Sequence, residues 1–271
     1  MVTGATDGIG KQTALQLAGM GARVLLHDND RQRLENTCRQ IHRMTGRDNL
    51  GLYRADLSKF VEVKTMVQEL LAQEAKLDVL VNNAGVYNPK PSLSVDGYEL
   101  TFAINHLGHF LLALLLLDKL KTSAPARIVV VASTEHSAQD IDYENLRTIR
   151  SYEGWSAYRR SKLANILFTY YLADLMRESG VTVNCLHPGV VDTKLLRSAF
   201  PHLKGISVEE GAATSVYLAS SLEVNGVTGK YFDKQKPNSS NPITYNKQAQ
   251  QRLWSFSQKV MVDLGYLDDH T

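Results

Sequence analysis

The sequence of 271 residues has little of what several protein classes require. It contains two cysteines, Cys38 and Cys185, which form no CxxC or Cys/His metal pattern, so a disulfide scaffold and a zinc module are excluded. Its 30 Lys and Arg balance 28 Asp and Glu, and no basic stripe indicates a nucleic-acid partner. The longest apolar run, Phe110 to Leu117, is far shorter than the roughly 18 residues of a membrane span.

The beginning of the chain carries no signal-peptide pattern. Only Met1 and Val2 precede a glycine-rich turn, whereas a turn of this kind normally follows a strand of about five or six residues. We expect either a natural chain that extends upstream, with any membrane anchor it carries, or an unusually short first strand. The two cysteines form no disulfide or metal-binding motif, which favours a reducing, cytoplasmic setting.

Short apolar segments alternate with helical patterns along the whole chain, and the composition, 44% hydrophobic and 21% charged, is that of a globular protein. This alternation predicts one α/β domain over residues 1–271, a single-domain Rossmann fold whose doubly wound, mostly parallel sheet has helices on both faces. The expected strands are Ala22–His27, Leu50–Ala55, Leu77–Val81, Arg127–Ala132, Val181–Leu186 and Gly229–Asp233. The expected helices are Ile9–Met20, Arg31–Thr45, Lys59–Ala75, Val95–Lys121, Ala157–Ser179, Ser207–Ser221 and Asn246–Leu264. Two segments interrupt the alternation, Thr134–Ser156 and Val190–Ile206, and long loops of this kind are often functional.

The turn from Thr3 to Gly10 has the pattern TGxxxGxG, with Asp7 and Ile9 on either side of Gly8. Glycines let the backbone approach a pyrophosphate closely, and the N-terminus of the following helix offers free N–H groups and a positive dipole end. The sequence therefore predicts a dinucleotide site; the alternative is a glycine-rich turn without a ligand.

Asp28 follows the second expected strand, 18 residues after Gly10, where an acid can bind the hydroxyls of the adenosine ribose. An acid at this place repels a 2′-phosphate and favours NAD(H). The alternatives are that Asp28 only opens a turn with Asn29 and caps the next helix, and that Lys11, Arg31 or Arg33 accommodates NADP(H).

Tyr158 and Lys162 are four residues apart, on one face of an expected helix. A nearby ammonium lowers the pKa of a phenol, and a tyrosine so activated exchanges a proton with a carbonyl or alcohol while a hydride moves. The pair alone is a weak signal, since with 12 tyrosines about 0.7 such pairs are expected by chance.

Taken together, these pieces resemble the short-chain dehydrogenase/reductase family, most closely its retinol-dehydrogenase-like branch, over almost the whole chain. The resemblance rests on motifs in the family's order: Thr3–Gly10, Asp56-Leu57, Asn82–Gly85, Asn105 within Asn105–Phe110, Ser133, the Tyr158/Lys162 pair, and His187-Pro188-Gly189 with Thr193. It implies an oxidoreductase that moves a hydride between a nicotinamide cofactor and an alcohol or carbonyl.

The resemblance also implies roles. Tyr158 is the general acid/base, Lys162 supports it and holds the nicotinamide ribose, Ser133 polarises the substrate oxygen, and Asn105 anchors a water for proton relay. The residues expected to contact the cofactor are Thr3, Gly4, Asp7, Gly8, Ile9, Gly10, Asp28, Asp56, Leu57, Asn83, Ala84, Gly85, Tyr158, Lys162, Pro188, Gly189, Val191 and Thr193. Asp7 stands where NADPH-binding relatives often carry a base, which again favours NAD(H).

Structural alternatives remain for several of these residues. Ser133 and the asparagines Asn82 and Asn83 could simply form turns, and Asn105 could be a buried, satisfied helix residue. No metal is expected, because His106, His109, His136 and His187 show no convincing ligand spacing.

The Val190–Ile206 segment is rich in apolar residues, and in this family it covers the substrate, so a lipophilic alcohol, aldehyde or ketone is expected. The alternative is a loop that packs on the core. Phe110–Leu117 lies in a helix that relatives use to form dimers; a homodimer would explain its composition, and so would burial in the chain's own core. Two other functions stay open: a non-catalytic cofactor-binding scaffold or sensor, and a sugar-nucleotide epimerase or dehydratase.

Overall fold

The computed structural model describes residues 1–136 and 140–268. Within them the strands form one sheet in the order β3-β2-β1-β4-β5-β6-β7-β8. Neighbouring strands are parallel, except that β7 and β8 are antiparallel at the edge. The order reverses at β1, so the first strand lies at the switch point of a doubly wound sheet. The strands are β1 Val2–Thr3, β2 Val24–Asp28, β3 Leu50–Arg54, β4 Val79–Asn82, β5 Ala126–Val131, β6 Val181–His187, β7 Tyr231–Asp233 and β8 Lys236–Asn238.

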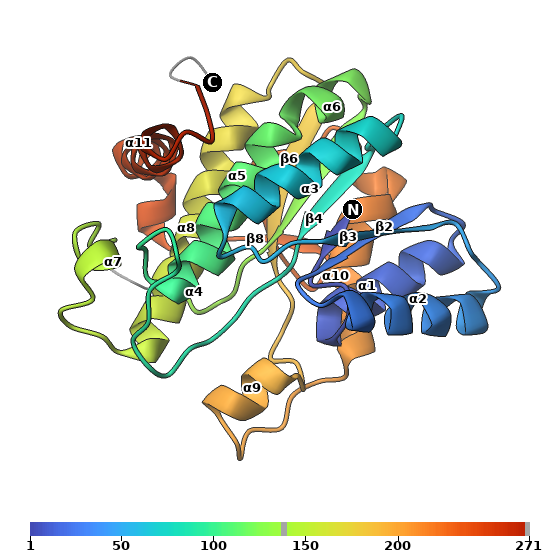
Figure 1. Ribbon diagram of the computed structural model, residues 1–271, viewed down its shortest axis with the longest axis horizontal. Coiled ribbons are helices and arrows are strands. Elements are labelled where there is room, and N and C mark those ends of the chain that lie inside the picture. Colours follow the sequence, from blue (N-terminus) through green and yellow to red (C-terminus); the bar gives the residue numbers. More distant parts are fainter. Residues whose placement is uncertain (137–139, 269–271) are drawn as a thin grey trace.

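Helices cover both faces of the sheet (Figure 1). One layer holds α1 Gly8–Gly19, α2 Arg31–Thr45 and α10 Val208–Ser220. The other holds α3 Phe60–Gln73, α5 Gly108–Leu115 and α8 Gly154–Leu175, with α4 Leu100–Phe102 and α6 Leu117–Thr122 at the ends of α5. Outside these layers lie α7 Asn145–Thr148, α9 Lys194–Ala199 and α11 Lys247–Asp263, and single turns span Leu222–Val224 and Pro242–Tyr245.

Alternation along the strands explains why two layers form. In β5, Ile128 and Val130 belong to the buried cluster on the α3/α5/α8 side, whereas Val129 and Val131 belong to the cluster on the α1/α2/α10 side. A strand whose successive side chains are all apolar can be buried only when both faces of the sheet are covered. The expected mostly parallel, doubly wound α/β fold is confirmed.

Several boundaries differ from the sequence prediction. The helix expected over Val95–Lys121 begins at Leu100 and is divided, because Ala103–Leu107 forms a π-helical turn and the helix breaks again at Leu116. The edge strand β8 was not predicted, since Lys236–Asn238 is exposed and polar. Both expected loops contain a short helix, α7 and α9, and residues 137–139 of the first loop lie outside the described residues.

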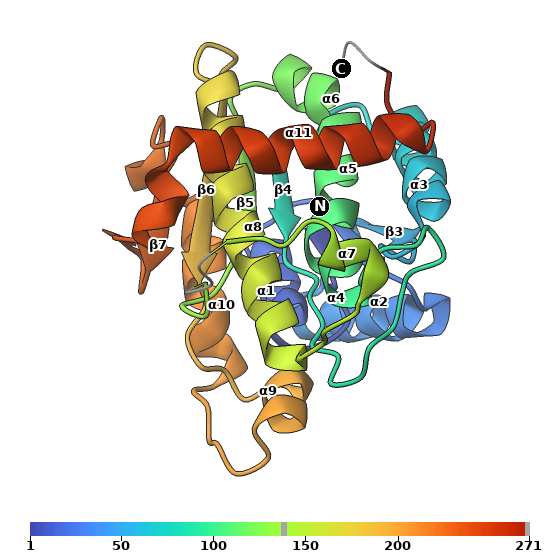
Figure 2. The ribbon, with the colours of Figure 1, turned by 90° about the vertical axis from the view of Figure 1, so that its left-hand side faces the viewer.

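The C-terminal helix α11 runs across α8 and α5 (Figure 2). Trp254 of α11 packs on Phe110 of α5, with ring centres 5.0 Å apart, and on Phe168 and Tyr171 of α8. Part of the apolar composition of Phe110–Leu117 is thus explained by packing within the chain.

Candidate active site

A cleft of about 550 Å³ lies at the carboxyl ends of the parallel strands. All but two of the residues predicted for the site line it; Thr3 and Asn105 lie behind its wall. This is the edge at which open α/β sheets bind ligands. The predicted residues in the lining are Gly4, Asp7, Gly8, Ile9, Gly10, Asp28, Asp56, Leu57, Asn83, Ala84, Gly85, Ser133, Tyr158, Lys162, Pro188, Gly189, Val191 and Thr193.

The glycine turn forms one end of the cleft. Gly4 and Gly8 have φ angles of +63° and +49°, which favour glycine, and a Cβ on Gly10 would lie 2.3 Å from the Gly4 carbonyl oxygen. Asp7 caps α1 by accepting a hydrogen bond from the Gly8 amide (2.9 Å). The turn therefore presents the backbone and the N-terminus of a twelve-residue helix directly to the cleft.

Thr3 fixes this turn to the strand beside it. Its hydroxyl oxygen accepts hydrogen bonds from the amides of Asn83 (2.8 Å) and Ala84 (2.9 Å), and the Asn83 side chain donates to the Thr3 carbonyl (2.8 Å). Asn83 thus links two distant segments and also lines the cleft. The turn that was the alternative for Asn82 and Asn83 is not found, since Asn82 ends β4 and Asn83 lies in no turn. Thr3 acts here from behind the cleft wall.

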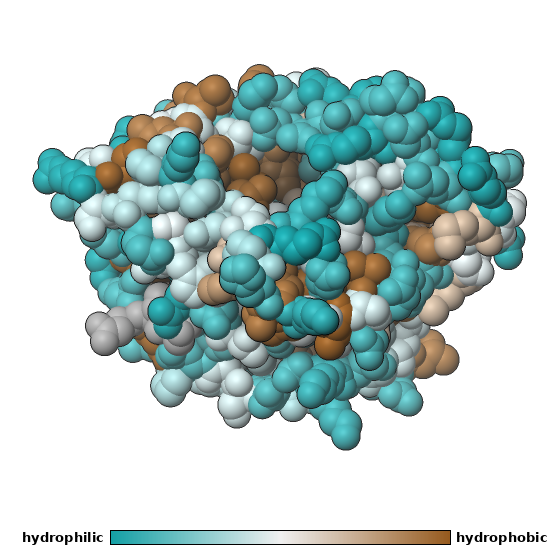
Figure 3. Space-filling model, turned by 90° about the horizontal axis from the view of Figure 1, so that it is seen from below, coloured by the Kyte–Doolittle hydropathy of each residue, from teal (hydrophilic) through white to brown (hydrophobic). Residues whose placement is uncertain are grey.

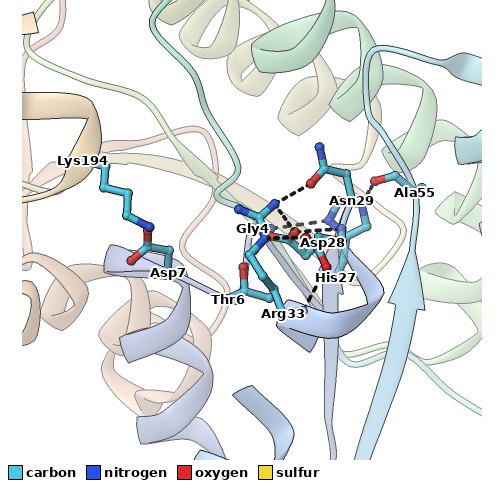
Figure 4. Close-up of polar contacts among 10 residues, drawn as sticks. Gly4, Thr6, Asp7, His27, Asp28, Asn29, Arg33, Ala55 and Lys194 are labelled. Atoms are coloured by element: carbon cyan, nitrogen blue, oxygen red, sulfur yellow. Dashed lines mark hydrogen bonds and ion pairs between the residues drawn. The ribbon is translucent and has the colours of Figure 1, made fainter. Parts of the chain in front are cut away.

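Asp28 lies at the end of β2 within a polar cluster (Figure 4). Its carboxylate accepts hydrogen bonds from the Thr6 hydroxyl (2.6 Å), the Asp30 amide (3.0 Å) and the Arg33 guanidinium (2.7 Å). Asp28 therefore forms the turn that the alternative expected, but its capping of the next helix was wrong, because Asp30 caps α2. Both Asp28 and Arg33 face the cleft, so an acid and a base share this position.

Asp56 and Leu57, after β3, line the same end of the cleft. The Asp56 carboxylate accepts from the amide (2.9 Å) and hydroxyl (2.7 Å) of Ser58. Beside it, His27 accepts from the Gly4 amide (3.4 Å) and donates from Nε2 to the Ala55 carbonyl (3.1 Å). Burial lowers the pKa of His27 to about 4, so it connects these segments as a neutral ring.

Tyr158 and Lys162 of α8 lie in the middle of the cleft, with Ser133 from the end of β5. The Tyr158 hydroxyl lies near enough to the Ser133 side chain for that side chain to lower the pKa of the phenol. The Ser133 hydroxyl also accepts from the Glu135 amide (3.1 Å), so it forms a turn as well. Lys162 donates to the Val131 carbonyl (3.0 Å), and its ammonium lies 5.5 Å from the centre of the Tyr158 ring.

Burial dominates the protonation of this pair. It raises the pKa of Tyr158 to about 12, partly offset by the nearby Ser133 side chain, and lowers the pKa of Lys162 to about 8. The lowering of the phenol's pKa expected from Lys162 is not found in the protein by itself, because burial raises the pKa and the group that lowers it is Ser133, not Lys162. At neutral pH Tyr158 is a phenol and Lys162 is charged.

Asn105 lies in the π-helical turn and is fully buried. Its amide oxygen accepts from the Val86 amide (2.8 Å), and its amide nitrogen donates to the Val86 carbonyl (3.0 Å) and the Ser161 hydroxyl (2.9 Å). A Cβ on Gly85 would be 3.6 Å from the Asn105 amide oxygen and 3.4 Å from the Lys162 ammonium. The side chain therefore matches the satisfied, structural alternative while lying close to Lys162.

The segment after β6 forms the outer wall. Pro188, Gly189, Val191 and Thr193 line the cleft, and Thr193 caps α9. Lys194 of α9 forms an ion pair with Asp7 (2.6 Å; Figure 4), so the outer wall contacts the glycine turn.

Comparison with known proteins identifies this arrangement. The sequence model of the family "short chain dehydrogenase" matches residues 1–204. The chain belongs to the short-chain dehydrogenase family. It is 41% identical to human retinol dehydrogenase 14, over 97% of this chain and 86% of that protein, and 38% identical to human polyprenol dehydrogenase, over 95% and 83%. A short-chain dehydrogenase of Escherichia coli, solved with NADPH, superimposes with a TM-score of 0.73 at 26% identity, over 87% of this chain and 95% of that one.

As a short-chain dehydrogenase of the retinol-dehydrogenase-like branch, the protein is an oxidoreductase that uses a nicotinamide cofactor and acts on CH–OH groups of small molecules. Among the described residues, no helix is both long and apolar enough to cross a bilayer. In the same residues, no three His, Cys, Asp or Glu side chains gather as a metal site would require.

The sequence prediction missed Trp155, which lines the dehydrogenase cleft and stacks on Tyr158, with ring centres 5.0 Å apart and an interplanar angle of 16°. The sequence could have indicated this contact, since Trp155 and Tyr158 are three residues apart and such residues share a helix face. Two other contacts were missed: Thr6 with Asp28, which adjoins the predicted turn, and Lys194 with Asp7, which only the fold brings together.

Proposed function

We propose that Tyr158 exchanges the proton, Ser133 polarises the substrate oxygen and Lys162 supports Tyr158, while Asn105 holds the π-helical turn and, through it, the proton path beside Lys162. The observation that carries this is that Ser133, Tyr158 and Lys162 line one cleft, which begins at the glycine turn. The bound nicotinamide would supply or accept the hydride. In carbonyl reduction, the phenol gives its proton to the oxygen that becomes an alkoxide. The charged Lys162 stabilises the phenolate that is left.

The proposed cofactor cradle consists of the glycine turn for the pyrophosphate, the ends of β2, β3 and β4 for the adenosine, and the segment after β6 for the nicotinamide. The fit is supported by the tight backbone at Gly10, where any side chain would collide with the Gly4 carbonyl. The N-terminus of α1, where the Asp7 side chain binds the Gly8 amide alone, suits a pyrophosphate through its dipole and its next amides. Thr3 would act indirectly, by holding the Asn83 and Ala84 backbone.

We propose NAD(H) as the favoured cofactor, because Asp28 would bind the ribose hydroxyls and repel a 2′-phosphate. NADP(H) is the alternative, supported by Arg33, whose guanidinium also faces the cleft, and by the NADPH complex of the E. coli relative. The Thr6 and Arg33 contacts orient the Asp28 carboxylate, and the Arg33 contact also offsets its charge. NAD(H) is favoured if the adenosine ribose binds the Asp28 carboxylate, and NADP(H) is favoured if a 2′-phosphate binds the Arg33 guanidinium.

Nicotinamide fluorescence measures this preference directly, with NADH and NADPH titrated into the wild type and into Asp28→Asn. The substitution keeps the shape and removes the charge. We expect tighter NADH binding by the wild type, and a shift of about 10-fold or more toward NADPH in the variant, from the loss of a charge-assisted hydrogen bond. Tighter NADPH binding by the wild type would overturn the NAD(H) proposal.

We propose a lipophilic alcohol, aldehyde or ketone as substrate. The outer half of the cleft is lined by apolar residues of the segment around α9, including Leu195, Leu196, Phe200 and Leu203. Seen from the side on which α9 lies, apolar side chains gather in and around a hollow (Figure 3). The relatives' names, retinol and polyprenol dehydrogenase, support the same class. Initial rates with medium-chain alcohols against sugars and hydroxy acids test it; faster turnover of the polar compounds would refute it.

Two other functions make different predictions for the same assays. A scaffold or sensor would bind the cofactor and turn over no alcohol or carbonyl. An epimerase or dehydratase would convert a sugar nucleotide without net consumption of cofactor. The complete Ser133, Tyr158 and Lys162 set in one cleft favours the oxidoreductase over the scaffold. The Gly4/Gly8/Gly10 spacing favours it over the epimerase or dehydratase, whose turn is usually TGxxGxxG.

The homodimer and the cytoplasmic setting stay predictions. Trp254 of α11 packs on Phe110 of α5 and on Phe168 of α8, so a dimer through α5 and α8 at this place would have to include α11 in its interface. Sedimentation of the purified protein measures the oligomeric state, and fractionation of cells that express it measures the location.

A further inference from the structure

Trp155 lies in the first turn of α8, one turn before Tyr158. Its position is fixed from several sides. The Trp155 amide donates to the Glu153 carboxylate (2.9 Å), which caps the helix. A Cβ on the neighbouring Gly154 would lie 2.6 Å from the Asn88 carbonyl oxygen, so the helix start and the segment after β4 are in close contact. The indole is therefore a rigid part of the cleft wall.

The indole belongs to an aromatic cluster formed by three segments of the chain. It stacks on the Tyr158 ring and meets the edge of Phe200, beyond α9, with ring centres 4.7 Å apart and an angle of 83°. Tyr87, after β4, meets it on another side at 5.9 Å. These contacts join the catalytic helix to the segment that covers the cleft.

Helix geometry separates two sides of Tyr158. Lys162 lies one turn toward the C-terminus and borders Gly85 and the proposed cofactor end, whereas Trp155 lies one turn toward the N-terminus and borders the apolar wall. Because the proposed cofactor occupies the Lys162 side, we infer that a substrate whose oxygen reaches Tyr158 and Ser133 extends toward the Trp155 side. The carbon that carries this oxygen would then lie against the indole.

We propose that Trp155 determines substrate specificity by limiting the space beside the reacting carbon, so that the site prefers primary alcohols and aldehydes at the end of an apolar chain. This inference rests on the proposed function. A primary carbinol carbon presents only hydrogen to the indole, whereas a secondary one presents a second carbon that needs about 3.5–4.0 Å to any ring atom. The indole is stacked on the phenol and held by Phe200 and Tyr87, so it leaves no room for this second carbon.

The test compares kcat/KM for decan-1-ol and decan-2-ol in the wild type, Trp155→Phe and Trp155→Ala. We expect the wild type to prefer decan-1-ol, and the secondary-to-primary ratio to rise at least 10-fold in Trp155→Ala, with Trp155→Phe intermediate. The matched control is Trp254→Phe, which changes the second tryptophan of the chain, on α11, and should leave the ratio unchanged. A constant ratio in Trp155→Ala overturns the inference and leaves the proposed function intact. Turnover of polar substrates in place of both decanols overturns both.

A fluorescence measurement covers the case in which Trp155→Ala does not fold. In Trp254→Phe, Trp155 is the remaining tryptophan. Adding decanal together with the oxidised cofactor, a pair that cannot exchange a hydride, should shift the Trp155 emission to shorter wavelength, because an apolar chain displaces water from the indole. An unchanged emission at saturating decanal would overturn the inference.

Discussion

His109 of α5 must be uncharged for the backbone around the glycine turn to keep its hydrogen bonds. Its Nδ1 lies 3.1 Å from the Asn105 carbonyl, which can only accept, so Nδ1 carries the proton. Nε2 then accepts from the Thr3 hydroxyl (2.8 Å), whose oxygen receives the amides of Asn83 and Ala84. Burial lowers the pKa of His109 to about 3.

The size of the effect follows from linkage. A histidine in the unfolded chain has a pKa near 6.5, so below this value the unfolded state binds the proton more tightly than the folded state. The free energy of unfolding therefore decreases as the pH falls from 6.5 toward 3. At about pH 5 the difference of about 1.5 pH units corresponds to about 2 kcal/mol from His109 alone.

Urea unfolding near pH 7.5 and near pH 5 measures this. In His109→Gln the total stability is lower at both pH values, but the loss between them should be about 2 kcal/mol smaller than in the wild type. His202→Gln is the matched control, because His202 is exposed, and its loss should equal that of the wild type. An equal loss in His109→Gln would refute the reasoning.

Two further substitutions test the cleft. Gly10→Ala should weaken NADH binding at least 10-fold in a fluorescence titration, because the new Cβ would lie 2.3 Å from the Gly4 carbonyl oxygen. The control Gly19→Ala, at the other end of α1, should bind NADH as the wild type does. Equal binding by both variants would argue against a closely packed glycine turn. Lys194→Ala removes the exposed ion pair with Asp7, so the free energy of unfolding should change by less than about 1 kcal/mol in a thermal melt. KM for the substrate should rise several-fold, because α9 loses its link to the glycine turn. An unchanged KM would show that this ion pair has no role in substrate binding.

Much of this fold could be predicted because its signals are local. The strand Arg127–Ala132 with its apolar run Ile128–Ala132, the glycine turn and the order of the motifs each follow from neighbouring residues. The π-helical turn at Ala103–Leu107 could not be predicted, since nothing in the run of apolar residues marks where the hydrogen bonding changes. Strand β8 is held by pairing with β7 and not by its own propensity, so it too escaped prediction.

The candidate site, like the fold, was predictable in part. Ser133, Tyr158 and Lys162 were predicted, and the structure brings them into one cleft. What could not be read from the sequence are the consequences of burial: the raised pKa of Tyr158, and the complete use of the Asn105 side chain by Val86 and Ser161. These depend on which groups lose water when distant segments meet.

The most direct test of the account is Tyr158→Phe, which removes one oxygen from the proposed proton donor and keeps the ring that Trp155 stacks on. We predict that hydride transfer with a medium-chain aldehyde falls by about 10²- to 10⁴-fold, the usual contribution of a general acid, while the dissociation constant for NADH stays within about twofold of the wild type. A variant that keeps more than about a tenth of the wild-type rate would contradict the assignment of Tyr158 as the proton donor.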